Sequence, residues 1–320
     1  MKVEEINIGT ITDKNYIQHT GAWAFSILKN CSTPSRVHFY MFESDLDDHS
    51  RELFNSLCKN FDAKVTYLRP DNKLFESLTL GSHLPRIIYC KLLFPDKLKK
   101  INKIIVLDSD LVFEGDIVEL WNFPLNGKTV AAVPDAGVEL QEMCKRKMGI
   151  PAEKEYLNSG VMLIDCKKWR KKKVMLKVIR FIKENPEKIS VQDQDGLNYV
   201  LQDDWVALPY EWNVIHPFYY NSIPLKRKLG IKEFDRIRKN PKVIHYTVKP
   251  WKFDKAHPKR DRYWYYLKQT PWEDYKYPDK NFKNLSSRIL RVMIRPLPWE
   301  VKVRAKEILE NKVLKRKIRL

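Results

Sequence analysis

The sequence predicts an α/β protein in which a mostly parallel central sheet is flanked by helices. Over the first two-thirds of the chain, short apolar runs rich in β-branched residues alternate with longer stretches of helical periodicity, which is typical of such a sheet. The chain has 320 residues, 43% of them hydrophobic, so it can bury a sizeable core. The expected strands are residues 6–11, 37–42, 64–68, 104–107, 129–133, 161–164 and 242–246.

Helical segments fill the connections between the early strands. In residues 16–28 and 49–60, apolar residues recur every three or four positions, so each segment offers one apolar face to the sheet. Strand and helix together form βαβ units. Beyond about residue 165 the pattern loosens: we expect a basic helix over residues 169–184 and an aromatic-rich irregular segment over residues 205–220.

Positive charge is concentrated at the end of the chain. The formal net charge is +19, large enough to need a polyanionic partner, and residues 287–320 hold eleven Lys or Arg against three Glu. We expect a domain of residues 1–280 and a basic amphipathic tail of residues 281–320. The tail is predicted to attach to an anionic membrane surface, and the alternative is a helical appendage packed on the domain.

The start of the chain and its cysteines bear on where the protein resides. Glu4 and Glu5 stand where a signal peptide needs a basic region and an apolar stretch, and no run approaches 18 consecutive apolar residues. The five cysteines are scattered without a C-x-x-C pair, so we expect reduced, buried thiols. The sequence therefore predicts a cytoplasmic protein held at the inner face of the membrane by its tail.

Two carboxylates follow the strand over residues 104–107. In an open α/β sheet the carboxyl ends of buried strands line the ligand crevice, and Asp108 and Asp110 stand at such an end. Residues i and i+2 of an extended segment point the same way, so these carboxylates converge while Ser109 points elsewhere. Two carboxylates together with diphosphate oxygens suit Mn²⁺ or Mg²⁺. For Asp108-Ser109-Asp110 alone, the alternative is a solvated turn.

A second strand end carries an imidazole. His245 lies in the strand over residues 242–246, and as a borderline ligand it favours Mn²⁺ over Mg²⁺. Lys249 follows four residues later, and its ammonium group could neutralise phosphates at the same metal. Taken alone, His245 is more often a strand-end histidine bonded to backbone, so its pairing with the aspartates needs other support.

That support comes from four motifs in order. They are IIVLDSDLVFEGDIVELW at 104–121, YLNSGVMLIDCKKW at 156–169, VQDQDGLN at 191–198 and VIHYTVKPW at 243–251. Together they resemble the motifs of family 8 glycosyltransferases, which include bacterial lipopolysaccharide galactosyl- and glucosyltransferases and, more distantly, glycogenin. The resemblance implies a sugar-nucleotide-binding fold of the glycosyltransferase A type, a UDP-hexose donor, Mn²⁺ and transfer with retention. It also implies a saccharide or glycolipid acceptor, whose pocket we expect in the second half of the chain.

The resemblance assigns roles to residues at the matching positions. Asp108, Asp110 and His245 resemble the metal ligands, and Lys249 resembles the lysine that binds the diphosphate. The remaining donor-site positions are Asp13, Asn15 and Tyr16 at the uridine, Lys91 beside the diphosphate and sugar, and Asp135, Asn158, Asp193 and Gln194 at the donor sugar. Ser109 is also expected among the residues that bind the donor. The chain departs from the family pattern in one respect, since the loop between His245 and Lys249 is shorter than in other members. Whether backbone N–H groups of this loop donate hydrogen bonds to the phosphates therefore stays open.

The residue type beneath the anomeric carbon bears on the mechanism. Gln194 resembles the residue at that position, and an amide is a poor nucleophile. We therefore expect front-side attack, with Gln194 stabilising an oxocarbenium-like centre and with Asp193 and Lys91 as the other catalytic candidates. Charge stabilisation on the departing UDP should be the largest single contribution. Double displacement through Asp193 or Asp195 stays open as the alternative.

Two other classes of protein compete with this interpretation. A haloacid-dehalogenase-type phosphatase would use Asp108 as its nucleophile, but that nucleophile usually opens the domain, and here more than a hundred residues come first. A nucleic-acid-binding module would use the aromatic residues for stacking, yet these lie away from the basic tail, so we expect no nucleic-acid partner. A dehydrogenase is excluded because no G-x-G-x-x-G follows the first strand.

Overall fold

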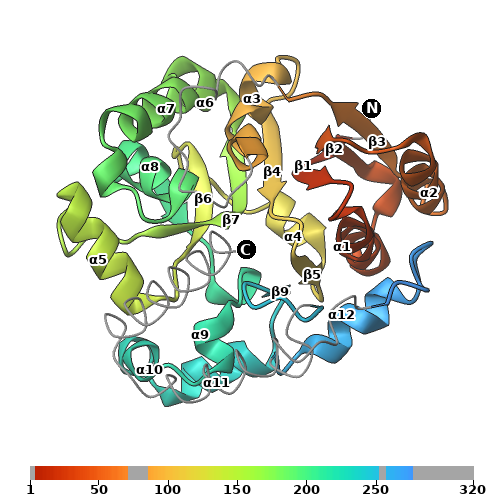
Figure 1. The fold of residues 1–320 in the computed structure, drawn as a ribbon. Helices are drawn as coiled ribbons and strands as arrows, with labels where there is room; N and C mark the ends of the chain where they lie inside the picture. The colour runs from red at the N-terminus through yellow and green to blue at the C-terminus, as the bar shows by residue number, and fades with distance from the viewer. Residues whose placement is uncertain (1–3, 71–85, 252–256, 277–320) are drawn as a thin grey trace, which may run out of the picture.

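The computed structural model describes residues 4–70, 86–251 and 257–276, and its central sheet is mostly parallel, as predicted (Figure 1). The seven strands stand in the order β3-β2-β1-β4-β7-β6-β8. Their bounds are β1 Ile6–Asp13, β2 Val37–Ser44, β3 Lys64–Leu68, β4 Lys103–Leu107, β6 Val130–Pro134, β7 Leu157–Asp165 and β8 Trp205–Ala207. Only β7 opposes its neighbours, since it runs antiparallel to both β4 and β6.

Helices cover both faces of the sheet because successive strand residues point to opposite sides. In β4, Ile105 and Leu107 enter one core while Ile104 and Val106 enter the other. The first core is closed by α1 (Ile17–Asn30), α2 (Asp48–Lys59) and α4 (Ile117–Trp121). The second is closed by η3 (Arg86–Leu93), α3 (Phe94–Lys97), α6 (Cys166–Lys171), α7 (Val174–Glu184) and α8 (Gln192–Leu201).

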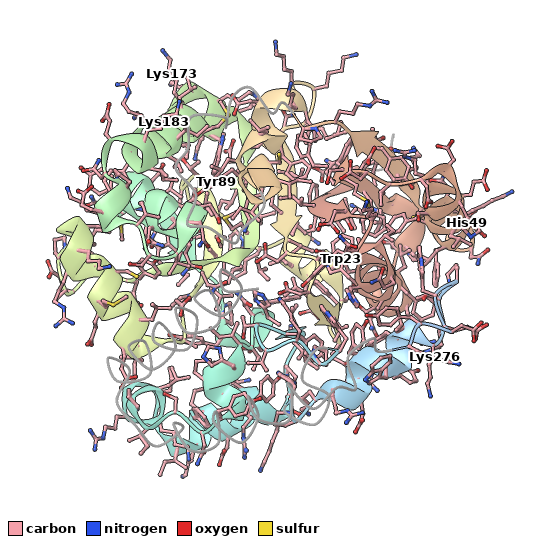
Figure 2. The ribbon with its side chains drawn as sticks, viewed as in Figure 1. Trp23, His49, Tyr89, Lys173, Lys183 and Lys276 are labelled. Atoms are coloured by element: carbon pink, nitrogen blue, oxygen red, sulfur yellow. The ribbon has the colours of Figure 1, made fainter. Side chains whose placement is uncertain are left out.

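The basic helix expected over residues 169–184 is wrong as a single element. The chain breaks between α6 and α7 at Lys173, whose φ of +53° lies in the left-handed region. Trp169 and Val174 are both buried in the same core, yet five residues of a straight helix separate side chains by about 140°. The break lets both pack on the sheet while Lys173 and Lys183 point outward (Figure 2).

A two-stranded sheet beside the central one positions the second half of the site. In it β5 (Leu111–Phe113) pairs antiparallel with β9 (Val243–His245), so the strand expected at 242–246 is present but lies outside the main sheet. The pairing sets Leu111 opposite His245, one residue from Asp110. The segment expected to be irregular over residues 205–220 contains β8 and the short helix α9 (His216–Tyr219).

The remaining helices are α5 (Val138–Met148), α10 (Ile223–Leu229), α11 (Ile231–Lys239) and α12 (Arg260–Leu267). All five cysteines are buried and unpaired, as expected. Among the residues that the structure describes, no helix has the length and apolar character needed to cross a membrane. The expected tail at 281–320 lies outside the described residues.

Candidate active site

Three side chains from two sheets converge at one point. One ligand atom from each of Asp108, Asp110 and His245 lies within 4.8 Å of the others. The Nε2 atom of His245 is 3.2 Å from Oδ1 of Asp110 and 3.9 Å from Oδ2 of Asp108. Asp108 follows β4 directly, and the β5–β9 pairing carries the histidine to it. Two carboxylates and one imidazole nitrogen form a donor set that suits a divalent metal ion.

The imidazole of His245 is held in the orientation that a metal ligand needs. It is 5% exposed, and burial lowers its pKa to about 4, so the ring is neutral at physiological pH. Its Nδ1 atom lies 2.9 Å from Oδ1 of Asn213, an acceptor that fixes the proton on Nδ1 and leaves the Nε2 lone pair toward the aspartates. A Cβ at Gly160 would lie 2.6 Å from the ring, so only glycine fits there.

Two lysines stand beside the aspartates. The Nζ atom of Lys91 is 2.8 Å from Oδ1 of Asp108 and 3.3 Å from Oδ2 of Asp193, and the residue is 6% exposed. Burial disfavours its charge, but the two carboxylates outweigh burial and raise the pKa of Lys91 above its usual value. Lys249 forms an ion pair with Oδ2 of Asp110. Both lysines are therefore cations at a site where a diphosphate could meet them.

Three of the four residues expected at the donor sugar, Asp135, Asn158 and Gln194, form one hydrogen-bonded network, whereas Asp193 contacts Lys91. Oδ2 of Asp135 accepts from Nδ2 of Asn158 at 2.7 Å and from Nε2 of Gln194 at 3.0 Å. Oε1 of Gln194 accepts from the backbone N–H of Ser159 at 3.1 Å. Asn213 closes the network by donating from Nδ2 to Oδ1 of Asn158 at 2.7 Å. The amide of Gln194 is therefore fixed at both ends, and the network reaches His245.

The two aspartates considered as nucleophiles differ in their surroundings. Asp195 is fully buried and accepts from Tyr156 Oη at 2.6 Å and from the backbone N–H groups of Ser190 and Val191 at 2.5 and 2.6 Å. Those three donors make Asp195 a structural residue that ties α8 to its surroundings. Asp193 contacts Lys91, and burial raises its pKa. The alternative of Asp195 as nucleophile is thereby disfavoured.

The residues expected at the uridine lie where β1 meets α1. Oδ1 of Asp13 accepts from the N–H of Asn15 at 2.8 Å, and the carbonyl of Asp13 accepts from the N–H of Tyr16 at 3.0 Å. The Tyr16 ring meets Trp251 edge to face, with ring centroids 5.7 Å apart. Burial first and then the charge of Asp108 raise the pKa of Tyr16. The turn after β1 therefore lies beside both Asp108 and the K-P-W segment.

Two further residues, Ser109 and Asn213, lie at the site. Ser109 is half-buried between the two aspartates. Asn213 was not singled out from the sequence, because it lies in the aromatic-rich segment at 205–220 with no motif around it. Its position between His245 and Asn158 is visible only in the folded chain.

A carboxylate pair at a strand end, joined by an imidazole and two lysines, is an arrangement suited to an enzyme that binds a divalent metal and a diphosphate. The chain belongs to glycosyl transferase family 8, whose model matches residues 7–255. The family expected from the motifs is confirmed, and so is the expectation of a retaining hexosyltransferase at the level of the family. A glycosyltransferase acts on a sugar donor and a saccharide acceptor. The protein is therefore neither a haloacid-dehalogenase-type phosphatase nor a nucleic-acid-binding module by class.

Individual relatives agree with this membership. The chain is 32% identical over 282 residues to general stress protein A of Bacillus subtilis, covering 85% of this chain and 96% of the relative. It is 27% identical over 274 residues to lipopolysaccharide 1,2-glucosyltransferase of Escherichia coli, covering 85% and 80%. The structure of galactosyltransferase LgtC with donor and acceptor sugar analogs superimposes with a TM-score of 0.73 at 22% identity, covering 83% and 96%. That likeness confirms the fold of the glycosyltransferase A type.

Proposed function

We propose that the protein transfers a hexose, galactose or glucose, from a UDP-sugar to a saccharide or glycolipid acceptor during the synthesis of lipopolysaccharide or another surface glycan. The observation that carries this proposal is the convergence of Asp108, Asp110 and His245 within 4.8 Å, beside Lys91 and Lys249. A relative named as a lipopolysaccharide glucosyltransferase supports the choice of a hexose and of a glycan acceptor.

The three converging residues would hold the metal, which we propose to be Mn²⁺. When bound, the ion supplies positive charge to the diphosphate of the donor. Mn²⁺ is preferred to Mg²⁺ because one of the three ligands is an imidazole, and Mg²⁺ is a harder ion that prefers oxygen. Asn213 supports the choice, since it holds the neutral tautomer of His245 that a metal ligand requires.

The donor would lie across the carboxyl ends of β1 and β4. The ring of Tyr16 is proposed to stack on the uracil, with Asp13 and Asn15 beside it. Lys249 would bind the diphosphate, because it already stands against Asp110. The sugar would meet the network of Asp135, Asn158 and Gln194, whose buried polar atoms can exchange hydrogen bonds with sugar hydroxyl groups.

Retention is proposed to follow from attack on the face that UDP leaves. The bond between the acceptor oxygen and the anomeric carbon forms as the bond to the phosphate oxygen breaks, and the acceptor proton passes to that phosphate oxygen. Gln194 supports this course because both ends of its amide are fixed, so its oxygen can stabilise the cationic centre without becoming a nucleophile. Lys91 and Lys249 would stabilise the charge on the departing UDP.

Hydrolysis of UDP-sugars without acceptor tests the proposal. We expect the protein to release UDP slowly from UDP-galactose or UDP-glucose when Mn²⁺ is present. A chelator should abolish this activity, and so should each of the substitutions Asp110→Ala and His245→Ala. Arg236→Gln, an exposed change on α11, serves as the control. If Asp110→Ala loses Mn²⁺-dependent UDP binding but His245→Ala does not, the proposed three-ligand site is wrong.

The domain boundary and the location of the protein are separate proposals. We propose that residues 1–280 form the catalytic domain and that the basic residues of 281–320 attach it to the inner face of the membrane, because eleven Lys or Arg stand against three Glu from residue 287 onward. Truncation after Lys280 should abolish sedimentation with vesicles that contain phosphatidylserine and leave UDP-sugar hydrolysis intact. Unchanged vesicle binding would contradict the attachment.

A further inference from the structure

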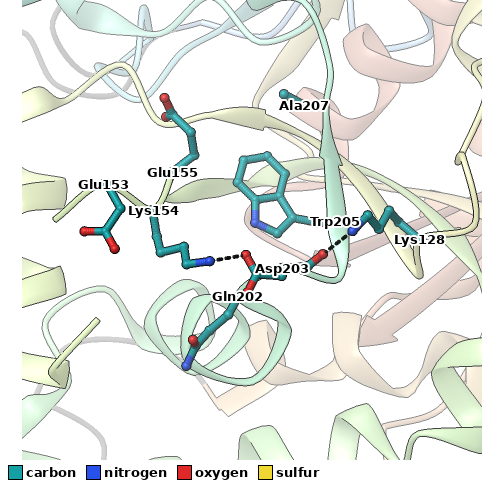
Figure 3. Close-up of a pocket in the computed structure, with 8 residues that line it drawn as sticks. All are labelled: Lys128, Glu153, Lys154, Glu155, Gln202, Asp203, Trp205 and Ala207. Atoms are coloured by element: carbon teal, nitrogen blue, oxygen red, sulfur yellow. Dashed lines mark hydrogen bonds and ion pairs between the residues drawn. The ribbon is translucent and has the colours of Figure 1, made fainter. Parts of the chain in front are cut away.

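A groove of about 350 Å³ lies along β8, the edge strand of the central sheet, outside the site described above (Figure 3). Its volume is at the lower end of the range for ligand sites. Trp205 stands in the middle of it, with acidic and amide side chains around the indole. The lining residues are Lys128, Glu153, Lys154, Glu155, Gln202, Asp203, Trp205 and Ala207.

Trp205 presents the two features that a sugar ring meets. Its indole is half-buried against the core on one side and is turned into the groove on the other (Figure 3). Among the residues that the structure describes, none accepts a hydrogen bond from its Nε1–H. Tryptophan combines a broad apolar face with one polar donor, and a pyranose combines an apolar C–H face with hydroxyl groups at its edge. The carboxylate of Glu153 adds acceptors for those hydroxyl groups, and so does that of Glu155, which keeps lone pairs beyond its ion pair with Lys228.

The charge of the groove argues against an anionic ligand. Two lysines and three carboxylates line the groove, and the carboxylate of Glu155 also pairs with Nζ of Lys228 at 3.0 Å, so no excess of positive charge gathers here although the chain as a whole carries +19. Both lysines are also occupied: Nζ of Lys154 lies 2.5 Å from Oδ1 of Asp203, and Nζ of Lys128 donates to the carbonyl of Asp203 at 2.6 Å. Lys154 is paired with a carboxylate and Lys128 is held by a carbonyl, so each lysine would have to leave its partner to bind a phosphate. A neutral polyhydroxyl ligand fits better.

Strand β6 connects the groove to the donor-sugar residues. In the parallel β6–β8 pair Trp205 stands opposite Val130, and β6 continues from there to Pro134 and then Asp135. That distance is about 17 Å at 3.3 Å per residue. Glu155, which lines the groove, is followed by Tyr156, whose carbonyl accepts a hydrogen bond from the N–H of Asp135 at 2.8 Å. A short oligosaccharide can span this distance along the sheet edge.

We propose that this groove is a secondary binding site for a neutral saccharide, and that it holds the part of the acceptor chain remote from the hydroxyl group that reacts. Trp205 stacks on one sugar ring, and Glu153 and Glu155 accept hydrogen bonds from its hydroxyl groups. The assignment to the acceptor rests on the proposed function. Saccharide binding in the groove does not, because it follows from the lining alone.

The indole N–H signal of Trp205 in an NMR spectrum of the ¹⁵N-labelled full chain tests the binding. The signal is assigned by its loss in Trp205→Phe, and the probes are lactose, maltotriose, cellotriose and chitotriose at millimolar concentration. We expect at least one probe to shift it, while the signal of Trp264, whose Nε1 atom is buried, stays unshifted and inositol hexaphosphate has no effect. No shift with any of the four, or an equal shift with inositol hexaphosphate, would overturn the proposal.

Kinetics separates the acceptor assignment from the proposed function. In the double variant Glu153→Gln, Glu155→Gln, we expect KM for an oligosaccharide acceptor to rise about three- to tenfold, with KM for a monosaccharide acceptor and hydrolysis of the UDP-sugar unchanged. Equal effects on long and short acceptors would refute the acceptor role. Absence of UDP-sugar hydrolysis in the unmodified protein would instead refute the proposed function and leave the NMR result standing.

Discussion

The Nδ1 atom of His245 lies 2.9 Å from Oδ1 of Asn213, and the Nδ2 atom of the same asparagine lies 2.7 Å from Oδ1 of Asn158. One amide therefore joins the candidate metal ligand to the residues expected at the donor sugar. All three side chains are buried, so none of these hydrogen bonds can be replaced easily by solvent. The arrangement makes Asn213 the residue that fixes the two halves of the site against each other.

Replacing Asn213 by Leu should weaken Mn²⁺ binding about 10- to 100-fold, because the imidazole loses the acceptor that sets its tautomer and orientation. Titration calorimetry with MnCl₂ measures the change. Asn213→Asp keeps an acceptor for His245 but loses the donor to Asn158, so it should retain metal affinity and raise KM for the UDP-sugar. Equal metal affinity in Asn213→Leu and the unmodified protein would contradict the role of Asn213.

Replacing Gln194 by Ala should lower kcat about 10²- to 10³-fold with little change in KM for the donor, because the amide oxygen is expected to act on charge that develops only in the transition state. Steady-state transfer assays separate the two constants. Tyr199→Phe, on the exposed side of the same helix α8, is the matched control. A glycosyl adduct trapped on Asp193 in Gln194→Ala would show that double displacement operates instead.

Tyr16 offers a test of the nucleotide end of the donor. Loss of a stacking ring costs about 1–3 kcal/mol per base, so Tyr16→Ala should raise KM for the UDP-sugar about 5- to 150-fold and leave kcat nearly unchanged. Tyr16→Phe keeps the ring and should behave like the unmodified protein. If the two variants bind UDP equally well in calorimetry, the uracil does not stack on Tyr16.

The fold was predictable to the extent that burial leaves a mark on the sequence. Strands buried on both faces, such as β4, read as apolar runs, and they were found where expected. The apolar pattern of a strand does not indicate whether the strand runs parallel or antiparallel to its neighbours, so the antiparallel direction of β7 was not predicted. The three-residue strands β5 and β8 are too short for a periodic signal. The break at Lys173 arises from packing demands that only the tertiary structure imposes.

The candidate site was predictable where a motif stands at a strand end. Asp108 and Asp110 were placed by the apolar strand before them, whereas His245 entered through the resemblance to a family. Asn213 was not found from the sequence because a single amide in an irregular segment belongs to no recognisable pattern. Its two hydrogen-bond partners also lie 32 and 55 residues away in the chain. Contacts of this kind exist only once β9 and β7 have been brought together.

Another buried histidine, His257, should make the stability of the metal-free protein depend on pH. Its ring lies between Tyr219 and Tyr246, Nδ1 accepts from the N–H of Lys259, and Nε2 is buried without a partner among the described residues. Burial, followed by His216 and His245, lowers the pKa of His257 to about 3. In the unfolded chain the pKa of this imidazole has its ordinary value near 6.5. Below that pH the unfolded chain therefore binds a proton that the folded chain does not bind.

Because the unfolded state binds more protons below pH 6.5, the free energy of unfolding should fall as the pH drops from 6.5 to 5, by about 1.4 kcal/mol per pH unit for each such histidine. His257 makes no contribution above pH 7, where it is neutral in both states. Urea unfolding at pH 7, 6 and 5 with chelator present measures the slope. His257→Phe should reduce this slope by the contribution of one proton, about 1.4 kcal/mol per pH unit, because phenylalanine cannot be charged in either state. An unchanged slope in His257→Phe would mean that this imidazole is protonated in the folded protein, against its burial between the two tyrosine rings.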